Sequence, residues 1–242
     1  MVTTPLEAEF RSKIPYDYGT AEYKLYETLI PALGKPRKVL VITDIEQDRD
    51  NLLAVLLLLH MHYLGIIEIV GFISNHYPSE KRAKTVLHLC GFPEIPVVAG
   101  TDGTGGRESR DLFWHELKNQ TFERQDWNNE ENEHFCGHTS ISELVNQATS
   151  DGQKVAVLCL SSLQDISEYL SEQDDEILQS RFAKFVSQGG YEIDGGFIKP
   201  DMKTMNNKFH PEAAKYFTDR LSKLNIRSEA WGKEVAVAAA LN

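Results

Sequence analysis

A short uninterrupted apolar run near the start of the chain, residues 39–42 (VLVI), limits the possible folds more than any other feature. Apolar and β-branched residues without polar alternation are typical of a strand that is buried on both faces, as in parallel sheets. The following residues, 50–64, carry leucines at helical spacing and end before Gly65, which can terminate a helix in the left-handed conformation. A buried strand followed by a helix predicts a parallel α/β sheet.

The same alternation of apolar runs and helical patterns continues along the chain. The predicted strands after the first are 66–74, 95–99, 154–160 and 182–186, and the predicted helices are 79–89, 140–149 and 165–170. A further helix opens at residues 210–214 (HPEAA), because a proline at the first helical position sacrifices no hydrogen bond. The sequence therefore predicts a doubly wound α/β fold, with a mainly parallel sheet flanked by helices.

The pattern also predicts the domain organisation. Residues 1–35 are polar with scattered aromatic residues and prolines, and we expect a lead-in that packs on the domain, with a short helix over 21–29. Residues 36–242 have a suitable length for a single domain. Between residues 103 and 138 the regular pattern is replaced by a glycine-rich and then an acidic stretch of sequence, which predicts an insertion or lid. The alternative is a solvated loop without a functional role.

The composition excludes several classes of partner. The chain has 25 Lys and Arg against 36 Asp and Glu, a net charge of −11, which argues against nucleic acid. The longest apolar run, 52–59, is shorter than the ~20 residues of a membrane-spanning helix. No phosphate-loop or dinucleotide motif is present, so no nucleotide cofactor is expected. The odd cysteine count and the lack of a signal pattern predict a cytoplasmic protein. With nucleic acid and membrane disfavoured as partners by the composition, a small-molecule ligand or substrate is expected.

An acidic segment lies directly after the first predicted strand. It contains Asp44, Glu46, Asp48 and Asp50 within seven residues. In parallel α/β sheets, ligands bind at this end of the strands. Carboxylates this close repel one another unless a cation, a proton or a hydroxyl-rich ligand is present, and capping of the next helix needs only one of them. The segment therefore predicts a site, with Asp44, Asp48 and Asp50 as candidate catalytic residues.

This segment and several later ones resemble, in order, the motifs of the inosine-uridine nucleoside hydrolases. The acidic segment resembles the D-x-D-x-G-x-D-D loop of that family. The other matching positions are Asn75 after the second strand, 96–100 (PVVAG), 158–166 (LCLSSLQDI, similar to L-G-P-L-T-N), 188–190 (QGG, similar to M-G-G) and 206–214 (similar to N-x-x-x-D-P-E-A-A). The resemblance covers residues 38–222, and it implies a nucleoside hydrolase-like fold and, as in many family members, a homo-oligomer.

The resemblance also implies a calcium ion that holds the ribose hydroxyls and the attacking water, with an aspartate as general base. Carried over position by position, the metal ligands are Asp44, Asn51 and the carbonyl group of Gln164. The positions implied for ligand binding are Asn75, Thr204 and Asn206, and the aromatic residues that could wall the pocket are Trp114, Tyr191 and Phe197.

The sequence departs from the family pattern at the metal ligands. Ile42 and Asn51 stand where the family has aspartates, Glu46 replaces the glycine, and the late His-Asp pair of the family has no counterpart. Replacing a carboxylate by an amide removes a charge from the ligand shell, and calcium affinity depends on that charge. We therefore expect calcium binding to be weak or lost, unless Asp48 or Glu46 supplies a substitute ligand, so that calcium is possible but its absence is favoured.

Three functions remain open at this point. The first is a divergent protein that has lost calcium-dependent N-ribosyl hydrolysis and uses the old cleft for another small-molecule role. The second is a metal-independent isomerase or cyclase that acts on an apolar secondary metabolite, because orientation in a shaped cleft can promote a unimolecular ring closure. The third is an active purine or pyrimidine nucleoside N-ribohydrolase with a remodelled site.

Overall fold

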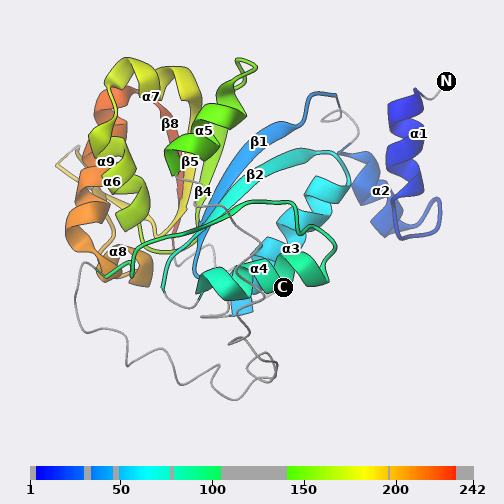
Figure 1. Ribbon diagram of the computed structural model, residues 1–242, viewed down its shortest axis with the longest axis horizontal. Helices are drawn as coiled ribbons and strands as arrows, with labels where there is room; N and C mark the ends of the chain where they lie inside the picture. Colours follow the sequence, from blue (N-terminus) through cyan, green and yellow to red (C-terminus); the bar gives the residue numbers. More distant parts are fainter. Residues whose placement is uncertain are drawn as a thin grey trace.

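The structure of the chain, a computed structural model, describes residues 4–29, 34–45, 49–76, 79–104, 141–195 and 197–232. Its centre is a six-stranded sheet of order β3-β2-β1-β4-β5-β8, in which all paired strands are parallel (Figure 1). The strands are β1 (Arg37–Thr43), β2 (Ile67–Ser74), β3 (Val97–Ala99), β4 (Val155–Cys159), β5 (Phe182–Gln188) and β8 (Arg227–Trp231). The strand order reverses between β1 and β4, which makes their carboxyl ends the topological switch point of the sheet.

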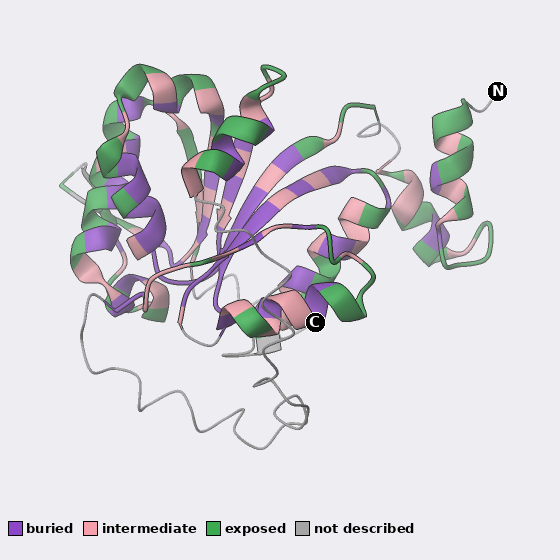
Figure 2. Ribbon diagram, in the orientation of Figure 1, coloured by how far each residue is buried: buried purple, intermediate pink, exposed green. Residues whose placement is uncertain are grey.

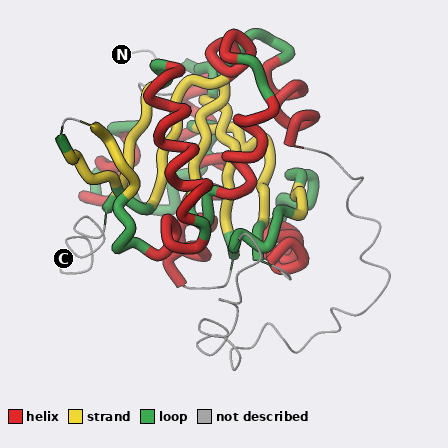
Figure 3. The backbone as a smooth tube through the Cα atoms, turned by 90° about the vertical axis from the view of Figure 1, so that its left-hand side faces the viewer, coloured by secondary structure: helices red, strands yellow, loops and turns green. Residues whose placement is uncertain are grey.

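Helices cover both faces of this sheet, which confirms the predicted doubly wound fold (Figures 1 and 3). One face packs against α5 (Ile141–Thr149), α6 (Gln164–Glu172), α7 (Asp175–Arg181) and α9 (Pro211–Leu224). The other face packs against α3 (Arg49–Tyr63) and α4 (Ser79–Leu89), with α1 (Pro5–Ser12) and α2 (Ala21–Glu27) beside them. The remaining elements are α8 (Met205–Phe209) and an antiparallel hairpin of β6 (Tyr191–Asp194) and β7 (Phe197–Pro200).

Strand β1 separates two hydrophobic clusters. Leu40 and Ile42 point into the cluster beneath α5, α6 and α9, whereas Val41 points into the cluster beneath α3 and α4. All three residues are completely buried. Buried residues lie along the strands of the central sheet, between the layers of helices (Figure 2). This alternation explains the uninterrupted apolar run in the sequence, because both faces of a central parallel strand contact helices.

Several elements lack an apolar signature and differ from the expectations. Helix α1 was not predicted, although Thr4 and Glu7 form a capping box at its start. Strand β8 is an edge strand whose residues are half-buried or exposed, so it has no buried-strand pattern. In the hairpin, Ile193 is largely exposed. The predicted insertion falls mainly on residues 105–140, which lie outside the described ranges.

Helix α3 is apolar on its outward side as well as its inward side. Leu53, Leu56 and Leu57 are 68%, 41% and 59% exposed, and residues 51–63 contain no acidic side chain, lysine or arginine. Despite this apolar helix, the described part of the chain contains no helix with the length and apolar character needed to cross a membrane.

Candidate functional site

Three buried polar residues follow neighbouring strands at the switch point. Asp44 follows β1, Asn75 follows β2, and Ser161 lies just beyond β4; they are 3%, 0% and 0% exposed. The backbone N–H of Asn75 donates to the carbonyl of Thr43 at 3.1 Å, and Leu160 N–H donates to Ile42 O at 2.8 Å. These bonds continue the register of the sheet beyond the strands, so Asn75 and Ser161 flank Asp44 at the carboxyl edge.

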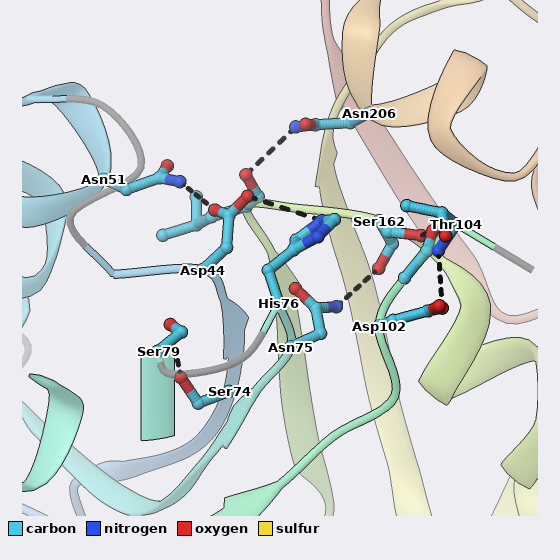
Figure 4. A network of polar contacts seen from close by, with 12 residues as sticks. Asp44, Asn51, Ser74, Asn75, His76, Ser79, Asp102, Thr104, Ser162 and Asn206 are labelled. Carbon is cyan, nitrogen blue, oxygen red and sulfur yellow. Dashed lines mark hydrogen bonds and ion pairs between the residues drawn. The ribbon is translucent and has the colours of Figure 1, made fainter. Parts of the chain in front are cut away.

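The Asp44 carboxylate is held by side chains from two other elements (Figure 4). The amide nitrogen of Asn51, in the first turn of α3, donates a hydrogen bond to Asp44 Oδ1. The Nε2 atom of His76, just beyond β2, lies 3.8 Å from Asp44 Oδ2. Burial raises the pKa of Asp44 to about 7, and the charge of Asp50 adds to the rise, while hydrogen bonds from its own backbone and from Asn51 oppose it. A buried carboxyl with a raised pKa at a sheet edge is typical of functional sites.

His76 is a site residue that the sequence did not indicate. Its φ of 64° is left-handed, a conformation that costs energy for a residue with a Cβ atom. The backbone N–H of His76 donates to Thr101 O at 3.1 Å, and its ring centroid lies 5.0 Å from that of Phe209. A Cβ atom at Gly103 would come within 2.9 Å of His76 Nε2, so glycine is required there. The only sequence signal is that His76 follows Asn75.

Asn75 belongs to a second network around Asp165, at the start of α6. Its amide nitrogen donates to Asp165 Oδ2 at 3.0 Å and to Ser162 O at 3.3 Å. Asp165 Oδ1 accepts a hydrogen bond from the backbone N–H of Thr101 at 2.6 Å. Burial raises the pKa of Asp165, against hydrogen bonds from Thr101 and Asn75. The network connects the ends of β2, β3 and β4.

Four buried side-chain oxygens at this edge have no hydrogen-bond partner among the described residues. They are Thr43 Oγ1, Asn75 Oδ1, Thr104 Oγ1 and Ser161 Oγ. Native proteins leave few buried polar atoms unpaired, since each costs about 1–3 kcal/mol. Two of the four, Asn75 Oδ1 and Ser161 Oγ, belong to the residues that flank Asp44.

Several other predicted site residues take part in local contacts. Gln188 Nε2 donates to Asp50 Oδ2 at 3.1 Å. The amide nitrogen of Asn206 donates to the carbonyls of Leu160 and Gln188, both at 3.0 Å, so this side chain joins the end of β4 to the end of β5. Thr204 Oγ1 donates to Asp201 O at 2.8 Å.

Two predicted site residues, Tyr191 of the aromatic wall and Gln164 of the calcium ligands, have no contact with Asp44 among the interactions of the described residues. The Tyr191 hydroxyl is hydrogen-bonded to Ser187 and Ser228, on β5 and β8, and burial raises its pKa. The Gln164 side chain donates to Glu168 at 2.8 Å, within helix α6. The remaining predicted site residues, Asp48, Trp114 and the side chain of Phe197, lie outside what the structure describes.

The side chains at this edge do not fit a calcium ion. Calcium takes six to eight oxygen ligands, of which carboxylates supply most of the charge. Here Asp44 accepts the Asn51 amide, the Leu160 carbonyl accepts the Asn206 amide, and Asp50 accepts the Gln188 amide. Across the described ranges, no three His, Cys, Asp or Glu side chains converge on a common point. The described residues therefore bring too few carboxylates together to supply the charge of a calcium ligand shell.

Comparisons with known proteins identify the fold through solved structures. No protein-family profile and no curated protein sequence matches the chain. The type III effector protein XopQ, in complex with adenosine diphosphate ribose, matches 97% of this chain with a TM-score of 0.63 and 17% identity. The effector protein XOO4466 matches 96% with a TM-score of 0.64 and 16% identity. The inosine-uridine preferring nucleoside hydrolase of Bacillus anthracis matches 82% with a TM-score of 0.58 and 20% identity.

This chain spans only part of those proteins, namely 64%, 62% and 65% of their respective lengths. At such low sequence identity, the likeness concerns the fold and not the activity. The expectation from the sequence motifs is confirmed at this level: the chain is a divergent protein with a nucleoside hydrolase-like fold.

Proposed function

We propose that the chain no longer performs calcium-dependent N-ribosyl hydrolysis and that it binds a small polyhydroxylated, ribosyl-type ligand at the switch point between β1 and β4. One observation carries this proposal. The two buried residues on either side of Asp44, Asn75 and Ser161, each have a side-chain oxygen without a partner in the described ranges.

The unpaired oxygens define the chemistry of the ligand. An amide oxygen such as Asn75 Oδ1 can only accept hydrogen bonds, whereas the hydroxyl of Ser161 can accept or donate. Asp44, whose pKa is about 7, accepts when it is ionised and can also donate when it is protonated. The ligand must therefore bring hydrogen-bond donors, and adjacent hydroxyl groups supply them. A phosphate or carboxylate group would bring none and would lie beside the charges of Asp44 and Asp50.

The comparison with XopQ supports the ribosyl class. That protein has been solved with adenosine diphosphate ribose, and its fold covers 97% of this chain. Adenosine diphosphate ribose and free ribose are therefore suitable first probes for this chain. In the larger molecule, the ribose hydroxyls would meet Asn75, Asp44 and Ser161, and the diphosphate would extend away from the acidic residues.

The loss of hydrolysis follows from the lack of fit to calcium. The carboxylate that the resemblance makes a metal ligand, Asp44, is already bonded to Asn51. An apolar substrate, as an isomerase or cyclase would require, has less support, because the residues placed around Asp44 are polar and Tyr191 contacts β5 and β8 instead.

Binding is tested by calorimetry and thermal shift with adenosine diphosphate ribose, inosine and ribose, all in EDTA. We expect at least one ribosyl compound to bind, and Ser161→Ala to weaken it about tenfold, which corresponds to the loss of one hydrogen bond. The matched control is Ser167→Ala, because Ser167 is a buried serine whose hydroxyl donates to Ala213 O at 2.9 Å, within the protein.

Two results would contradict the proposal. Failure of every ribosyl compound to bind or to raise the melting temperature would exclude a ribosyl-binding site. The second result is release of free base from inosine or uridine in a reaction that contains calcium, with the products separated by chromatography. That release would show that the chain is an active hydrolase.

A further inference from the structure

We infer that two side chains of this protein, the amide of Asn51 and the imidazole of His76, replace a divalent cation at Asp44. The Asn51 nitrogen donates to one carboxylate oxygen, and His76 Nε2 lies 3.8 Å from the other. Figure 4 shows both groups directed at Asp44 from different elements. The Asn51 amide thus donates the one side-chain hydrogen bond that Asp44 accepts among the described residues, and the imidazole of His76 lies within ion-pair distance of the other oxygen, at the positions that ligands of a metal ion would need.

Asn51 is fixed in this role by its position. It is buried in the first turn of α3, where its side chain points back to the loop that follows β1. The hydrogens of an amide nitrogen carry partial positive charge, which favours the carboxylate and repels a cation. To serve as a cation ligand, Asn51 would have to present its oxygen instead and give up the hydrogen bond to Asp44.

His76 is held beside Asp44 by its backbone and by its neighbours. Its left-handed φ of 64° and the hydrogen bond from its N–H to Thr101 O set the direction of the side chain. The ring lies against Phe209, and the close approach to Gly103 leaves no room for a Cβ atom there. Strained backbone of this kind persists where the surrounding structure requires it. The imidazole therefore stands at the second oxygen of Asp44, where a hard cation would need oxygen ligands.

The oxygens that remain nearby are also engaged. The Leu160 carbonyl accepts from Asn206, and Asp50 accepts from Gln188. A carbonyl or carboxylate oxygen has more than one lone pair, so these two hydrogen bonds do not by themselves exclude a cation. The groups that oppose a cation at Asp44 are the Asn51 amide, which presents its nitrogen, and the His76 imidazole, which occupies the place of an oxygen ligand. Removing the nitrogen donors and supplying an oxygen at position 51 should therefore convert this edge into a cation site.

The test measures calcium alone, without any organic ligand, by thermal shift and calorimetry. The wild-type protein should show no calcium-dependent rise in melting temperature. Asn51→Asp should lower the melting temperature in EDTA, because it places two carboxylates together, and calcium should restore it, with an affinity about tenfold or more above that of the wild type. The matched control is Asn146→Asp, which adds the same charge at an exposed position of α5 and should gain nothing.

A second variant covers the case in which Asn51→Asp does not fold. His76→Asp keeps a residue that tolerates the left-handed conformation and supplies carboxylate oxygens, so it should also gain calcium binding, and the double variant should bind most tightly. Wild-type binding of calcium that Asp44→Asn abolishes would overturn the inference, and so would a lack of gain in the folded variants. The proposed ribosyl binding is measured in EDTA, so either idea can fail while the other stands.

Discussion

Asp44 and Asp165 are two buried aspartates at the same edge of the sheet, yet they are used differently. Both are almost completely buried, and burial raises the pKa of each. Asp165 accepts hydrogen bonds on both oxygens, from Thr101 and from Asn75, and thereby joins α6 to the ends of β2 and β3. Asp44 accepts one side-chain hydrogen bond, from Asn51, and lies between two residues with unpaired oxygens.

We infer from this difference that Asp165 is a structural carboxyl, whereas Asp44 belongs to the proposed binding site. A buried carboxyl whose bonds are completed by the protein stabilises the fold, because its neighbours cannot find other partners. A buried carboxyl beside unpaired polar atoms lowers the stability of the folded protein, because the protein itself does not complete its hydrogen bonds. Such groups are common in binding sites. Substitutions at the two positions should therefore change stability in opposite directions.

The largest effect is expected for Asp165→Ala. Loss of the carboxyl leaves the N–H of Thr101 and the amide of Asn75 without their acceptor in a buried place. We expect the free energy of unfolding to fall by about 3 kcal/mol, measured by urea denaturation. Asp165→Asn, which keeps an acceptor oxygen, should lose less. A loss below about 1 kcal/mol would show that the network around Asp165 does not support the sheet edge.

Asp44→Asn should instead stabilise the protein at high pH. The pKa of Asp44 is raised to about 7 in the folded protein, so between about pH 4 and pH 7 the folded state keeps a proton that the unfolded chain releases. The contribution of this carboxyl to the free energy of unfolding of the wild type is therefore lost as the pH rises from about 4 to 7. Above about pH 7 this contribution no longer changes.

An amide at position 44 does not titrate, so the advantage of Asp44→Asn should grow from pH 4 to pH 7. A rise in pKa of this size corresponds to about 4 kcal/mol at most, and we expect about 2 kcal/mol at pH 8, because the amide accepts a weaker hydrogen bond from Asn51. Unfolding experiments at pH 5 and pH 8 measure the difference. A variant less stable than the wild type at pH 8 would show that Asp44 is a structural carboxyl like Asp165.

The smallest effect is expected on the free energy of unfolding when two buried serines, Ser161 and Ser167, are compared in the absence of ligand. Ser161→Ala removes a hydroxyl that has no partner among the described residues, whereas Ser167→Ala removes one that donates to Ala213 O. We expect the first variant to gain about 0.5 kcal/mol and the second to lose about 1 kcal/mol in thermal unfolding. Equal losses in both variants would mean that Ser161 has a partner within the protein.

The fold could largely be predicted because its central strands carry the strongest patterns. The apolar run of residues 39–42 occurs where both faces of β1 are covered, and Val55 and Leu59, at helical spacing, are buried on the inward side of α3. Elements at the margin could not be predicted in this way. Strand β8 and the β6–β7 hairpin contain polar and exposed residues, since an edge strand or a hairpin buries little surface.

The candidate site could be predicted only in part. The positions of Asp44 and Asn75 after successive buried strands predicted that they lie at the same edge of the sheet, and the structure places both there. His76 could not be found, because its place beside Asp44 depends on a left-handed backbone and on Phe209 from a distant segment. The different roles of Asp44 and Asp165 were equally hidden, because they depend on which donors reach each carboxyl.

The order of strands in the sheet also determines when the site can form during synthesis. Strands β1, β2 and β3 follow one another along the chain, so their half of the sheet can assemble early. Strand β4 pairs with β1 only after the long segment between Ala99 and Val155 has emerged, and distant pairings of this kind are slow to form. In a nascent chain, Asp44 therefore meets Asn51 and His76 before its neighbours beyond β4, Leu160 and Ser161, and the site is complete only when the second half of the protein docks.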